Sequence, residues 1–499
     1  MHWTALDIRA DRQRREPLYR QIVAHLREEI RGGRLPPGTR LPPTRILARQ
    51  LGVTRLTVVN AYAELEADGL VTSHVGRGTF VAGTDGETPV ARTWPPSATP
   101  GRPATELLDE FFRMARGPGV IAIHSPTALR ELVPVKELQR AMAAVLRREG
   151  AEAVGYDAPG GYAPLREWLG EHLSEIGIRA AADSIVITAG TQQAIDLVTK
   201  LLVQPGDVVF TDSPTYVVVI DLLEARGARI IGVPMDAEGA RLDIMETLIV
   251  RYRPRLFFTM PTFHNPTGIT MSLERRRRLV TLARRHQLPV LEDDVHRDLW
   301  FTPPPPPLRA LDRHGVVLYA SGLTKSLLLG GLRLGFLVVP PEVKRQFVTA
   351  KQAADLHTNS LIQRVMDTLL RQGRLERPMV RLRQALQARR DRMVDALERE
   401  MPEGIRWTVP EGGYHLWLSL PPGISGVALY RAAIQHGVAV APGMPFFPDR
   451  EDRGHARLTF AVESPAAIDQ GVRRLATAAR QLLRARRPDD SRDLRRPVI

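Results

Sequence analysis

Cysteine is absent from the sequence, which excludes disulfide bonds, thiolate zinc sites and a cysteine nucleophile, and fits a reducing compartment. No apolar run comes near the roughly 18 residues that indicate a membrane span. The first residues, MHWTALDIRADRQRRE, include no apolar stretch of the signal-peptide type. We therefore expect a cytoplasmic protein that has no membrane partner and no metal site.

Lysine is scarce as well. Only five lysines occur among the 69 basic residues, namely Lys136, Lys200, Lys325, Lys344 and Lys351. A guanidinium group cannot form an imine, so each remaining lysine is a candidate for chemistry that needs a primary amine. The formal net charge of +14 favours polyanionic partners, nucleic acid above all, although an arginine-rich coding bias is an alternative source of that charge.

The length of 499 residues exceeds what one hydrophobic core organises, so at least two domains are expected. Residues 83–106, GTDGETPVARTWPPSATPGRPATE, are rich in Pro, Thr, Gly and Ser without apolar periodicity, which is typical of a linker. The predicted organisation is therefore an N-terminal domain over residues 1–82, the linker, and a larger domain over residues 107–499.

The N-terminal domain has the pattern of a winged helix-turn-helix. Apolar residues recur at helical spacing in PLYRQIVAHLREEIRGG, and a Pro/Gly turn leads to a second helix in TRILARQLG. Thr54 is a plausible N-cap of a third helix that ends at Gly69, and LVTSHVGRGTFVA predicts a β-hairpin around Gly76-Arg77-Gly78. In this plan the third helix enters the major groove of DNA.

The segment LPPTRILARQLGVTRLTVVNAYAELEADGLVTSHVGRGTFV closely resembles the DNA-binding domain of GntR-type regulators, and the resemblance covers residues 17–82. It implies binding to a double-stranded DNA operator, and two-fold symmetric half-sites imply a homodimer. The alternative is that these polar residues are the solvated face of a small helical domain. The contact positions of the family fall on Arg45, Thr54, Arg55, Thr57, Arg77 and Gly78.

From about Leu107 to Leu483, short apolar strands alternate with helices, which predicts an α/β domain with a mainly parallel sheet. The strand candidates are SIVITAG, DVVFTD, RIIGVPM, RLFFTMP, PVLEDD, VVLYAS and GFLVVP. Lys325 follows one of them, so its amine is expected at the C-terminal edge of the sheet, where α/β proteins bind ligands. Taken alone, this segment would equally suit a surface lysine in a glycine-rich loop.

Further motifs point to the same edge. AGTQ lies between a strand and a helix, where free backbone N–H groups form a phosphate cradle. Asp293 ends a buried strand, so its carboxylate needs a partner, and a protonated pyridine nitrogen is one. Asn265 lies in a Pro/Gly-held loop as a hydrogen-bond donor, and Tyr216 offers a ring that stacks on a flat heterocycle.

Together, AGTQ, SPTY, HNPTG, EDD, SGLTK and an arginine eight residues later resemble the fold type I aminotransferases, which use pyridoxal 5'-phosphate (PLP). The resemblance runs from about residue 107 to 483 and implies a small C-terminal α+β lobe at about 375–485. It implies that Lys325 forms the internal aldimine and that Asp293 pairs with the pyridine nitrogen. Asn265 bonds the ring oxygen, and Tyr216 stacks on the ring.

The resemblance assigns the remaining site residues as well. Tyr156 matches a tyrosine that reaches the phosphate of the neighbouring subunit, which implies a head-to-tail homodimer. Arg457 matches an arginine that grips a substrate carboxylate, for which a bidentate fork is suited. The residues implied to hold the phosphate are Gly190, Thr191, Gln192, Thr324 and Arg333.

One position departs from the family pattern. A tyrosine that bonds the ring oxygen usually follows the aspartate two or three residues on, but this chain has Val295 and His296 there. His296 is a candidate for a similar hydrogen bond, although a neutral imidazole has only one N–H. The change puts ordinary transaminase efficiency in doubt, but it leaves cofactor binding intact.

The fusion of both parts resembles the MocR (GabR or PdxR-like) subfamily of GntR regulators. That resemblance implies a PLP-dependent transcriptional regulator whose aminotransferase-like domain senses PLP, or PLP with a small amino compound, through an aldimine at Lys325. A ligand alters DNA binding only if it favours one arrangement of the protein over another. The alternatives are an active aminotransferase that carries a DNA-binding head, and a DNA-binding protein with a vestigial scaffold.

Overall fold

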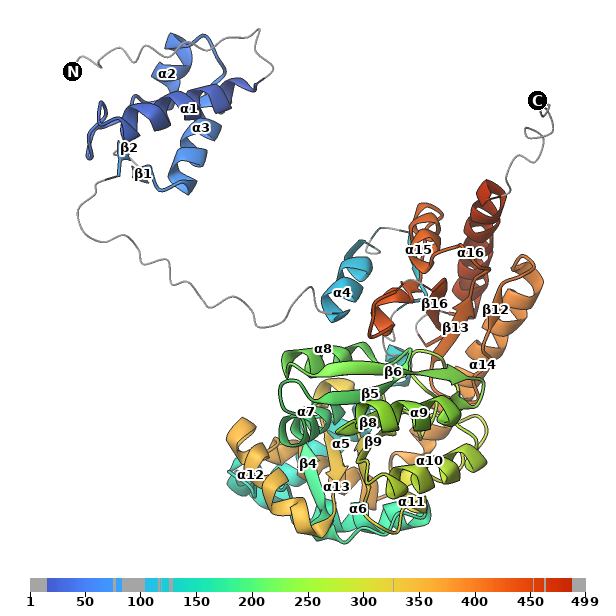
Figure 1. The fold of residues 1–499 in the computed structure, drawn as a ribbon. Coiled ribbons are helices and arrows are strands. Elements are labelled where there is room, and N and C mark those ends of the chain that lie inside the picture. The colour runs from blue at the N-terminus through green and yellow to red at the C-terminus, as the bar shows by residue number, and fades with distance from the viewer. Residues whose placement is uncertain are drawn as a thin grey trace, which may run out of the picture. The chain divides into compact units, whose positions relative to one another are not determined.

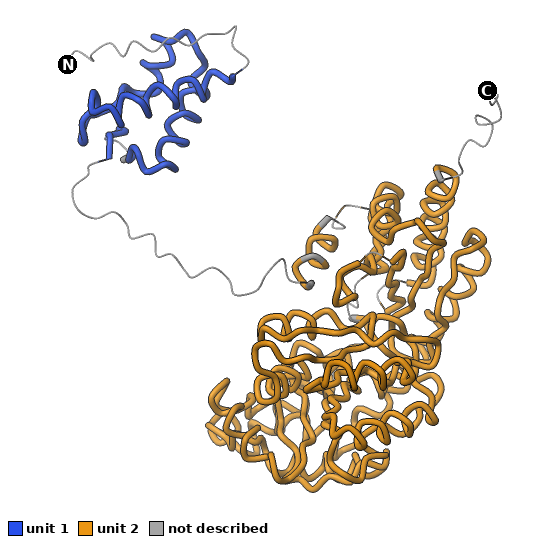
Figure 2. Tube along the Cα trace, viewed as in Figure 1, with its two compact units in different colours: residues 1–96 blue, residues 97–499 orange. Residues whose placement is uncertain are grey.

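The computed structural model describes residues 16–74, 78–82, 104–114, 117, 119–124, 129–325, 327–451, 453–461 and 464–486. The chain divides into two compact units, residues 1–96 and residues 97–499 (Figure 2). No helix in the described part of the chain is long and apolar enough to cross a membrane.

The first unit consists of three helices and a hairpin, as predicted from the sequence. The helices are α1 (Leu18–Arg31), α2 (Thr44–Gln50) and α3 (Arg55–Ala67). Strands β1 (Val71–His74) and β2 (Gly78–Val81) pair antiparallel. The helical spacing in α1 buries Ile22 and Leu26 against Val58 and Leu65 of α3, so one small core holds the unit together.

The second unit is built on an eight-stranded sheet of order β4-β11-β10-β9-β8-β5-β6-β7. Its strands are β4 (Ile185–Thr188), β5 (Val208–Ser213), β6 (Arg229–Asp236), β7 (Gly239–Ala240), β8 (Leu256–Thr259), β9 (Val290–Asp293), β10 (Val317–Gly322) and β11 (Gly335–Val338). The five central strands β10, β9, β8, β5 and β6 are mutually parallel, whereas β11 and β7 run antiparallel to their neighbours. The predicted mainly parallel sheet is thus confirmed, and each predicted strand is present.

Helices cover both faces of this sheet (Figure 1). One face packs against α7 (Thr191–Leu202), α8 (Val217–Ala225) and α12 (Lys344–Asp355). The other face packs against α5 (Val135–Glu149), α6 (Ala163–Glu175), α9 (Leu242–Tyr252), α10 (Leu273–Arg285), α11 (Leu308–Leu311) and α13 (Ser360–Arg371). This coverage explains why β4, β8 and β11 consist almost entirely of apolar residues, since both of their faces are buried.

A smaller lobe follows, formed around the antiparallel sheet β12-β13-β16-β15. Its strands are β12 (Arg406–Trp407), β13 (His415–Ser419), β15 (Ala441–Pro442) and β16 (His455–Thr459), and its helices are α14 (Glu376–Glu400), α15 (Gly426–Gln435) and α16 (Pro465–Arg486). Short 3-10 turns lie at Arg130–Leu132, Gly150–Val154, Ala182–Ser184, Gly330–Leu332, Pro341–Val343 and Met444–Phe446.

The beginning of the second unit is not part of the large sheet. Helix α4 (Ala104–Met114) starts inside the last residues of the segment predicted as linker, and β3 (Ile121–Ala122) pairs parallel with β14 (Val438–Ala439) of the small lobe. This pairing could not be predicted from the sequence, because a two-residue strand carries no periodicity.

Candidate cofactor site and DNA-binding face

The predicted DNA contacts gather at the N-terminal ends of α2 and α3. The Thr54 hydroxyl accepts a hydrogen bond from the backbone N–H of Thr57 at 3.2 Å, which confirms Thr54 as the N-cap of α3. The side chains of Arg45 and Arg55 are exposed beside it. The geometry leaves these side chains available to phosphates and base edges, and their contact with DNA stays a prediction.

The wing contributes one described residue of the predicted set. Gly78 has a φ of 110°, and a Cβ there would lie 2.8 Å from Nε of Arg40, so only glycine fits. Arg77 lies outside the described residues.

The predicted phosphate cradle forms where three segments meet. Gly190 has a φ of 86° and precedes α7, so the backbone N–H groups at the start of α7 open onto the cradle. A Cβ on Gly190 would lie 2.9 Å from Nη2 of Arg333, and one on Gly322 would lie 3.0 Å from Oγ1 of Thr191. The absence of side chains at Gly190 and Gly322 therefore lets the Arg333 guanidinium and the Thr191 hydroxyl lie close to the start of α7, an arrangement of donors that suits an anion.

Lys325 follows β10 and is half-buried at this edge of the sheet. Burial lowers the pKa of its amine, the negative charge of Asp293 opposes that effect, and the positive charges of Arg457 and Arg333 reinforce it. Its Nζ lies 6.0 Å from the ring centroid of Tyr216. A buried amine of lowered pKa is what imine formation with a carbonyl cofactor requires.

Asp293 is the last residue of β9 and is 2% exposed. Burial raises the pKa of its carboxyl group to about 7, against the opposing effects of Lys325 and of the Val295 N–H, which donates to Oδ1 at 3.1 Å. A carboxylate in this position gains most from a cationic partner in the adjacent space. A protonated pyridine nitrogen meets that requirement.

Arg457 on β16 and Asn265 after β8 come from different lobes but are in contact. Nη1 of Arg457 donates to Oδ1 of Asn265 at 2.9 Å, and Nη2 donates to the carbonyl oxygen of His124 at 3.1 Å. Burial lowers the pKa of Arg457 to about 10. Its Nε has no partner among the described residues, so a hydrogen-bond donor remains for a ligand carboxylate.

His296, on the turn after β9, is completely buried. Its Nδ1 lies 3.1 Å from the carbonyl oxygen of Phe263, and its Nε2 has no partner within the described parts of the chain. Burial holds the pKa of this imidazole well below its usual value, with the charge of Lys325 adding to the effect.

Two further buried histidines were not identified from the sequence. Nε2 of His264 lies 3.6 Å from Oδ2 of Asp212, and the ring of His415 lies 5.8 Å from that of His296, centroid to centroid. Burial lowers the pKa of both imidazoles. His264 could have been identified from the sequence, since it directly precedes Asn265 in the motif HNPTG. His415 lies in a strand that has no motif.

The other predicted phosphate ligands occupy different environments. Thr324 is buried, but its hydroxyl is bonded within the protein. It donates to the carbonyl oxygen of Leu334 at 3.3 Å and accepts from the Leu334 N–H at 3.4 Å. These two hydrogen bonds restrain the loop that contains Lys325. Gln192 is exposed on the first turn of α7. Their roles toward phosphate stay predictions.

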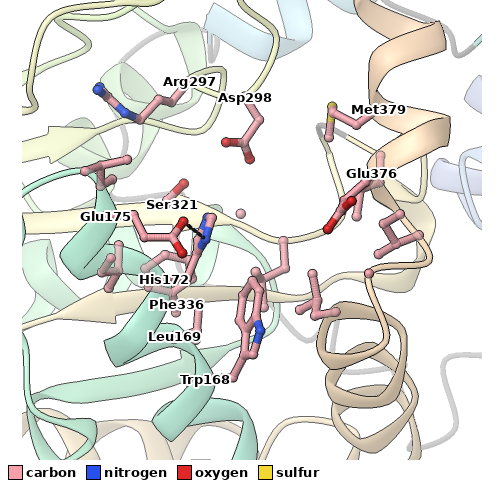
Figure 3. Close-up of a pocket in the computed structure, with 18 of the residues that line it drawn as sticks. Trp168, Leu169, His172, Glu175, Arg297, Asp298, Ser321, Phe336, Glu376 and Met379 are labelled. Atoms are coloured by element: carbon pink, nitrogen blue, oxygen red, sulfur yellow. Dashed lines mark ion pairs between the residues drawn. The ribbon is translucent and has the colours of Figure 1, made fainter.

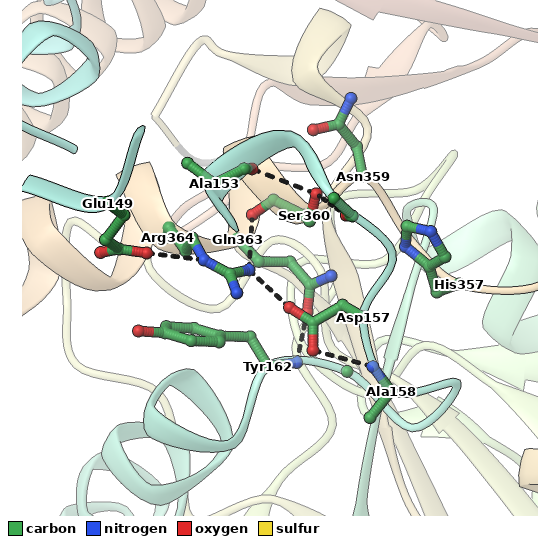
Figure 4. Close-up of polar contacts among 12 residues, drawn as sticks. Glu149, Ala153, Asp157, Ala158, Tyr162, His357, Asn359, Ser360, Gln363 and Arg364 are labelled. Atoms are coloured by element: carbon green, nitrogen blue, oxygen red, sulfur yellow. Dashed lines mark hydrogen bonds and ion pairs between the residues drawn. The ribbon is translucent and has the colours of Figure 1, made fainter. Parts of the chain in front are cut away.

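Tyr156 is 88% exposed, with its ring 5.6 Å from that of His357. The loop around it is held firmly against α13 (Figure 4). Ser360 Oγ donates to the carbonyl oxygens of Ala153 and Gly155, and the Tyr162 N–H donates to Oε1 of Gln363 at 2.8 Å. A large exposed ring on a fixed loop suits contact with another molecule.

A cavity of about 550 Å³ lies on the other side of the Lys325 loop (Figure 3). Trp168 and His172 of α6 and Met379 of α14 line it, with Leu323 and Leu327 from the loop itself. None of the predicted cofactor residues lines this cavity, so it is distinct from the cofactor site.

Comparison with known proteins agrees with this geometry. Residues 18–81 match the family described as bacterial regulatory proteins, gntR family, and residues 130–475 match aminotransferase class I and II. The chain is 33% identical to the uncharacterized HTH-type transcriptional regulator YdfD of Bacillus subtilis, over 93% of this chain and 97% of that protein. It is 30% identical to the probable rhizopine catabolism regulatory protein MocR of Rhizobium meliloti, over 94% and 95%.

Among solved structures, LysN, an α-aminoadipate aminotransferase from Thermus thermophilus complexed with N-(5'-phosphopyridoxyl)-L-leucine, is 35% identical. The TM-score is 0.69 over 76% of this chain and 99% of that chain. The aminotransferase match and this phosphopyridoxyl ligand identify pyridoxal phosphate as the cofactor, and the cradle at Gly190 and the buried Asp293 fit it. The chain therefore belongs to the MocR-type regulators, in which a GntR-family DNA-binding domain precedes an aminotransferase class I and II domain.

Proposed function

We propose that this protein is a PLP-dependent transcriptional regulator in which a small amino compound with a carboxylate, bound at Lys325 and Arg457, changes the affinity of the chain for operator DNA. The observation that carries the proposal is helix α4. It is the first described element after the linker, and it is attached to both lobes of the aminotransferase domain.

The N-terminal end of α4 is attached to the large lobe. The backbone N–H of Thr105 donates to Oδ2 of Asp221 on α8 at 3.0 Å, and the Thr105 hydroxyl donates to the same oxygen. The other end is attached to the small lobe, where the hydroxyl of Tyr430 on α15 donates to the carbonyl oxygen of Phe111 at 2.6 Å. The rings of Phe111 and Tyr430 also meet edge to face at 4.9 Å.

The same helix contacts the surroundings of the predicted ligand arginine. Phe112 packs on the imidazole of His124 with a centroid distance of 4.5 Å, and the carbonyl oxygen of His124 accepts from Arg457. Leu108 lies in one apolar cluster with Phe446, and the guanidinium of Arg457 lies 4.8 Å from the Phe446 ring centroid. A carboxylate that engages Arg457 therefore acts on groups that directly support α4.

The coupling follows from linkage. A ligand that draws Arg457 toward Lys325 favours one distance between the two lobes. Because α4 is hydrogen-bonded to both lobes, a change in that distance strains or relaxes its two attachments. Because the linker leads from α4 to the DNA-binding domain, a change at α4 alters the restraint on that domain. A ligand with equal affinity for both arrangements of the lobes has no effect on DNA binding.

A homodimer is part of the proposal. The exposed Tyr156 on its fixed loop favours contact with a second copy, whose phosphate site it would complete, and paired DNA-binding domains suit two-fold operators. Sedimentation of the PLP-loaded protein tests this point, since a monomeric species at micromolar concentration would contradict it.

The main experiment compares DNA affinity with the chemistry of the cofactor. Full-length protein is titrated with operator DNA in the presence of PLP, with and without a panel of amino acids, while absorbance follows conversion of the bound cofactor to its pyridoxamine form. We expect an effective amine to change the DNA affinity at least fivefold, within the usual range of coupling energies. Arg457→Gln should lose the response to carboxylate-bearing amines.

The variant Tyr430→Phe tests α4 itself, because it removes one hydrogen bond to Phe111 and keeps the ring. Amine binding should persist while its effect on DNA affinity declines. Tyr252→Phe, on the surface helix α9, is the matched control. The second candidate is an active aminotransferase with a DNA-binding head, which the 35% identity to LysN supports. Rapid turnover of amino acids, together with a DNA affinity that neither PLP nor amines change, would favour this candidate.

A further inference from the structure

We propose that His296 presents a hydrogen-bond acceptor, not a donor, to the ring oxygen of the bound cofactor, so that this protein favours the form in which that oxygen carries a proton. The inference rests on the binding of PLP at Lys325, and it deepens the proposed function by assigning a role to the residue that replaces the family's tyrosine.

The hydrogen bond at the other ring nitrogen fixes the tautomer of His296. Nδ1 lies 3.1 Å from the backbone carbonyl oxygen of Phe263, and a carbonyl oxygen only accepts. Nδ1 must therefore carry a proton. In a neutral imidazole, Nε2 is then left with a lone pair and no hydrogen. Nε2 is buried and has no partner among the described residues, so the lone pair is available.

The surroundings keep His296 neutral. It is fully buried, and the guanidinium of Arg457 near it is cationic, as is consistent with a pKa well below the usual value. The other titratable groups packed around it are the imidazoles of His264 and His415 and the phenol of Tyr414, whose ring lies 5.0 Å away. No carboxylate is among the described groups that shift its pKa, and the Phe263 carbonyl alone, which the neutral ring also satisfies, favours protonation.

Asn265 supplies the complementary donor. Its Oδ1 already accepts from Nη1 of Arg457, so its Nδ2 is the atom free to donate to a ring oxygen. A hydroxyl group accepts from one neighbour and donates to another, which matches one amide donor and one imidazole acceptor. A bare phenolate would meet the amide donor on one side and a repelling lone pair on the other.

The family's tyrosine has the opposite effect, because a hydroxyl donor stabilises the negative ring oxygen. In the cofactor linked to Lys325, one proton is shared between the ring oxygen and the nitrogen of Lys325. His296 therefore shifts that proton from the nitrogen to the oxygen, and the total number of protons stays the same. This shift gives a spectroscopic signature, because the hydroxyl form absorbs in the near ultraviolet and the phenolate form at the edge of the visible.

The test is the ratio of these two bands in the PLP-loaded full-length protein at constant pH, for the wild type, His296→Tyr and His296→Phe. We expect the near-ultraviolet band to dominate in the wild type. His296→Tyr should shift the ratio toward the visible band by about tenfold, the effect of one charge-assisted hydrogen bond, and His296→Phe by less. The control His415→Phe removes a neighbouring buried imidazole and should change the ratio less than twofold.

Nitrogen-15 NMR of histidine-labelled protein tests the tautomer directly and needs no activity. Nε2 of His296 should show the shift of an unprotonated nitrogen, identified by its loss in His296→Phe. A protonated Nε2, or a wild type dominated by the visible band that His296→Phe leaves unchanged, would overturn the inference. If borohydride fixes no cofactor on Lys325, PLP binding at this lysine fails and the inference fails with it. A fixed adduct with unchanged band ratios overturns the inference alone.

Discussion

Gly190→Ala is the most informative single substitution in the cofactor site. Gly190 has a φ of 86°, and a Cβ there would lie 2.9 Å from Nη2 and 3.1 Å from Cζ of Arg333. The methyl group therefore imposes two separate costs. The first is a backbone conformation (φ 86°, ψ 165°) that is essentially restricted to glycine and costs an alanine about 1–3 kcal/mol of stability, and the second is displacement of the guanidinium from the cradle.

The second cost falls on cofactor binding. If Arg333 loses one hydrogen bond to the phosphate, the loss is about 1.5–3 kcal/mol, which corresponds to about 10- to 150-fold weaker binding of PLP. Gly206→Ala is a matched control, because Gly206 has a φ of 88° and a Cβ there would meet nothing within 4 Å. Gly206→Ala therefore places an alanine at a positive φ without displacing the guanidinium of Arg333.

The assay is a titration of cofactor-free protein with PLP, followed by absorbance, together with urea unfolding of the same proteins. Both variants should lose stability, and only Gly190→Ala should lose PLP affinity. A Gly190→Ala protein that binds PLP as the wild type does, with the expected loss of stability, would refute the assignment of the cradle to residues 189–192 and Arg333.

Three further predictions concern stability and DNA. Because burial raises the pKa of Asp293 from 3.8 to about 7, the folded protein binds an extra proton, and stability of the cofactor-free protein should fall as the pH rises from about 4 through 7. Asp293→Asn should reduce the fall between pH 5 and pH 8 in urea unfolding, and an unchanged fall would contradict the buried state. Thr54→Ala should cost the first unit about 1 kcal/mol through the lost N-cap of α3. The exposed Arg55→Ala should leave stability unchanged while reducing the salt slope of DNA binding by about one, and an unchanged slope would exclude a phosphate contact.

The architecture could be predicted from the sequence wherever a local pattern of apolar residues and turns was repeated along the chain. Each apolar run of the large sheet, such as that of β9, is bounded by turns and buried on both faces, so its position could be predicted. The N-cap at Thr54 and the role of Gly190 before a helix could also be predicted, because a short motif determines each of them.

What the sequence did not supply depends on contacts between distant segments. The pairing of β3 with β14 and the attachment of α4 to both lobes involve residues more than 100 positions apart. The tautomer of His296 follows from its distance to the Phe263 carbonyl, which no motif encodes. Residue identity indicated that a polar group faces the cofactor there, but geometry determines whether that group donates or accepts.

The structure explains why two of the five lysines are lysine and not arginine. Among the described residues, the Nζ of Lys325 has no hydrogen-bond or ion-pair partner, so the amine is available for an imine. Lys351 is buried, and its Nζ is paired with Oδ1 of Asp355 at 2.7 Å.

The pair at Lys351 in turn supports the cradle. Asp355 accepts from Nε2 of Gln193 at 2.9 Å, and Oε1 of Gln193 accepts from the Ala189 N–H at 2.7 Å, which fixes the turn before Gly190. A single ammonium fits this enclosed site, whereas a planar guanidinium requires more room and more acceptors. Two of the lysines therefore occupy positions that suit an amine better than a guanidinium: Lys325, where the proposed imine requires a reactive nitrogen, and Lys351, whose small ammonium holds Asp355 and the turn before Gly190 in place.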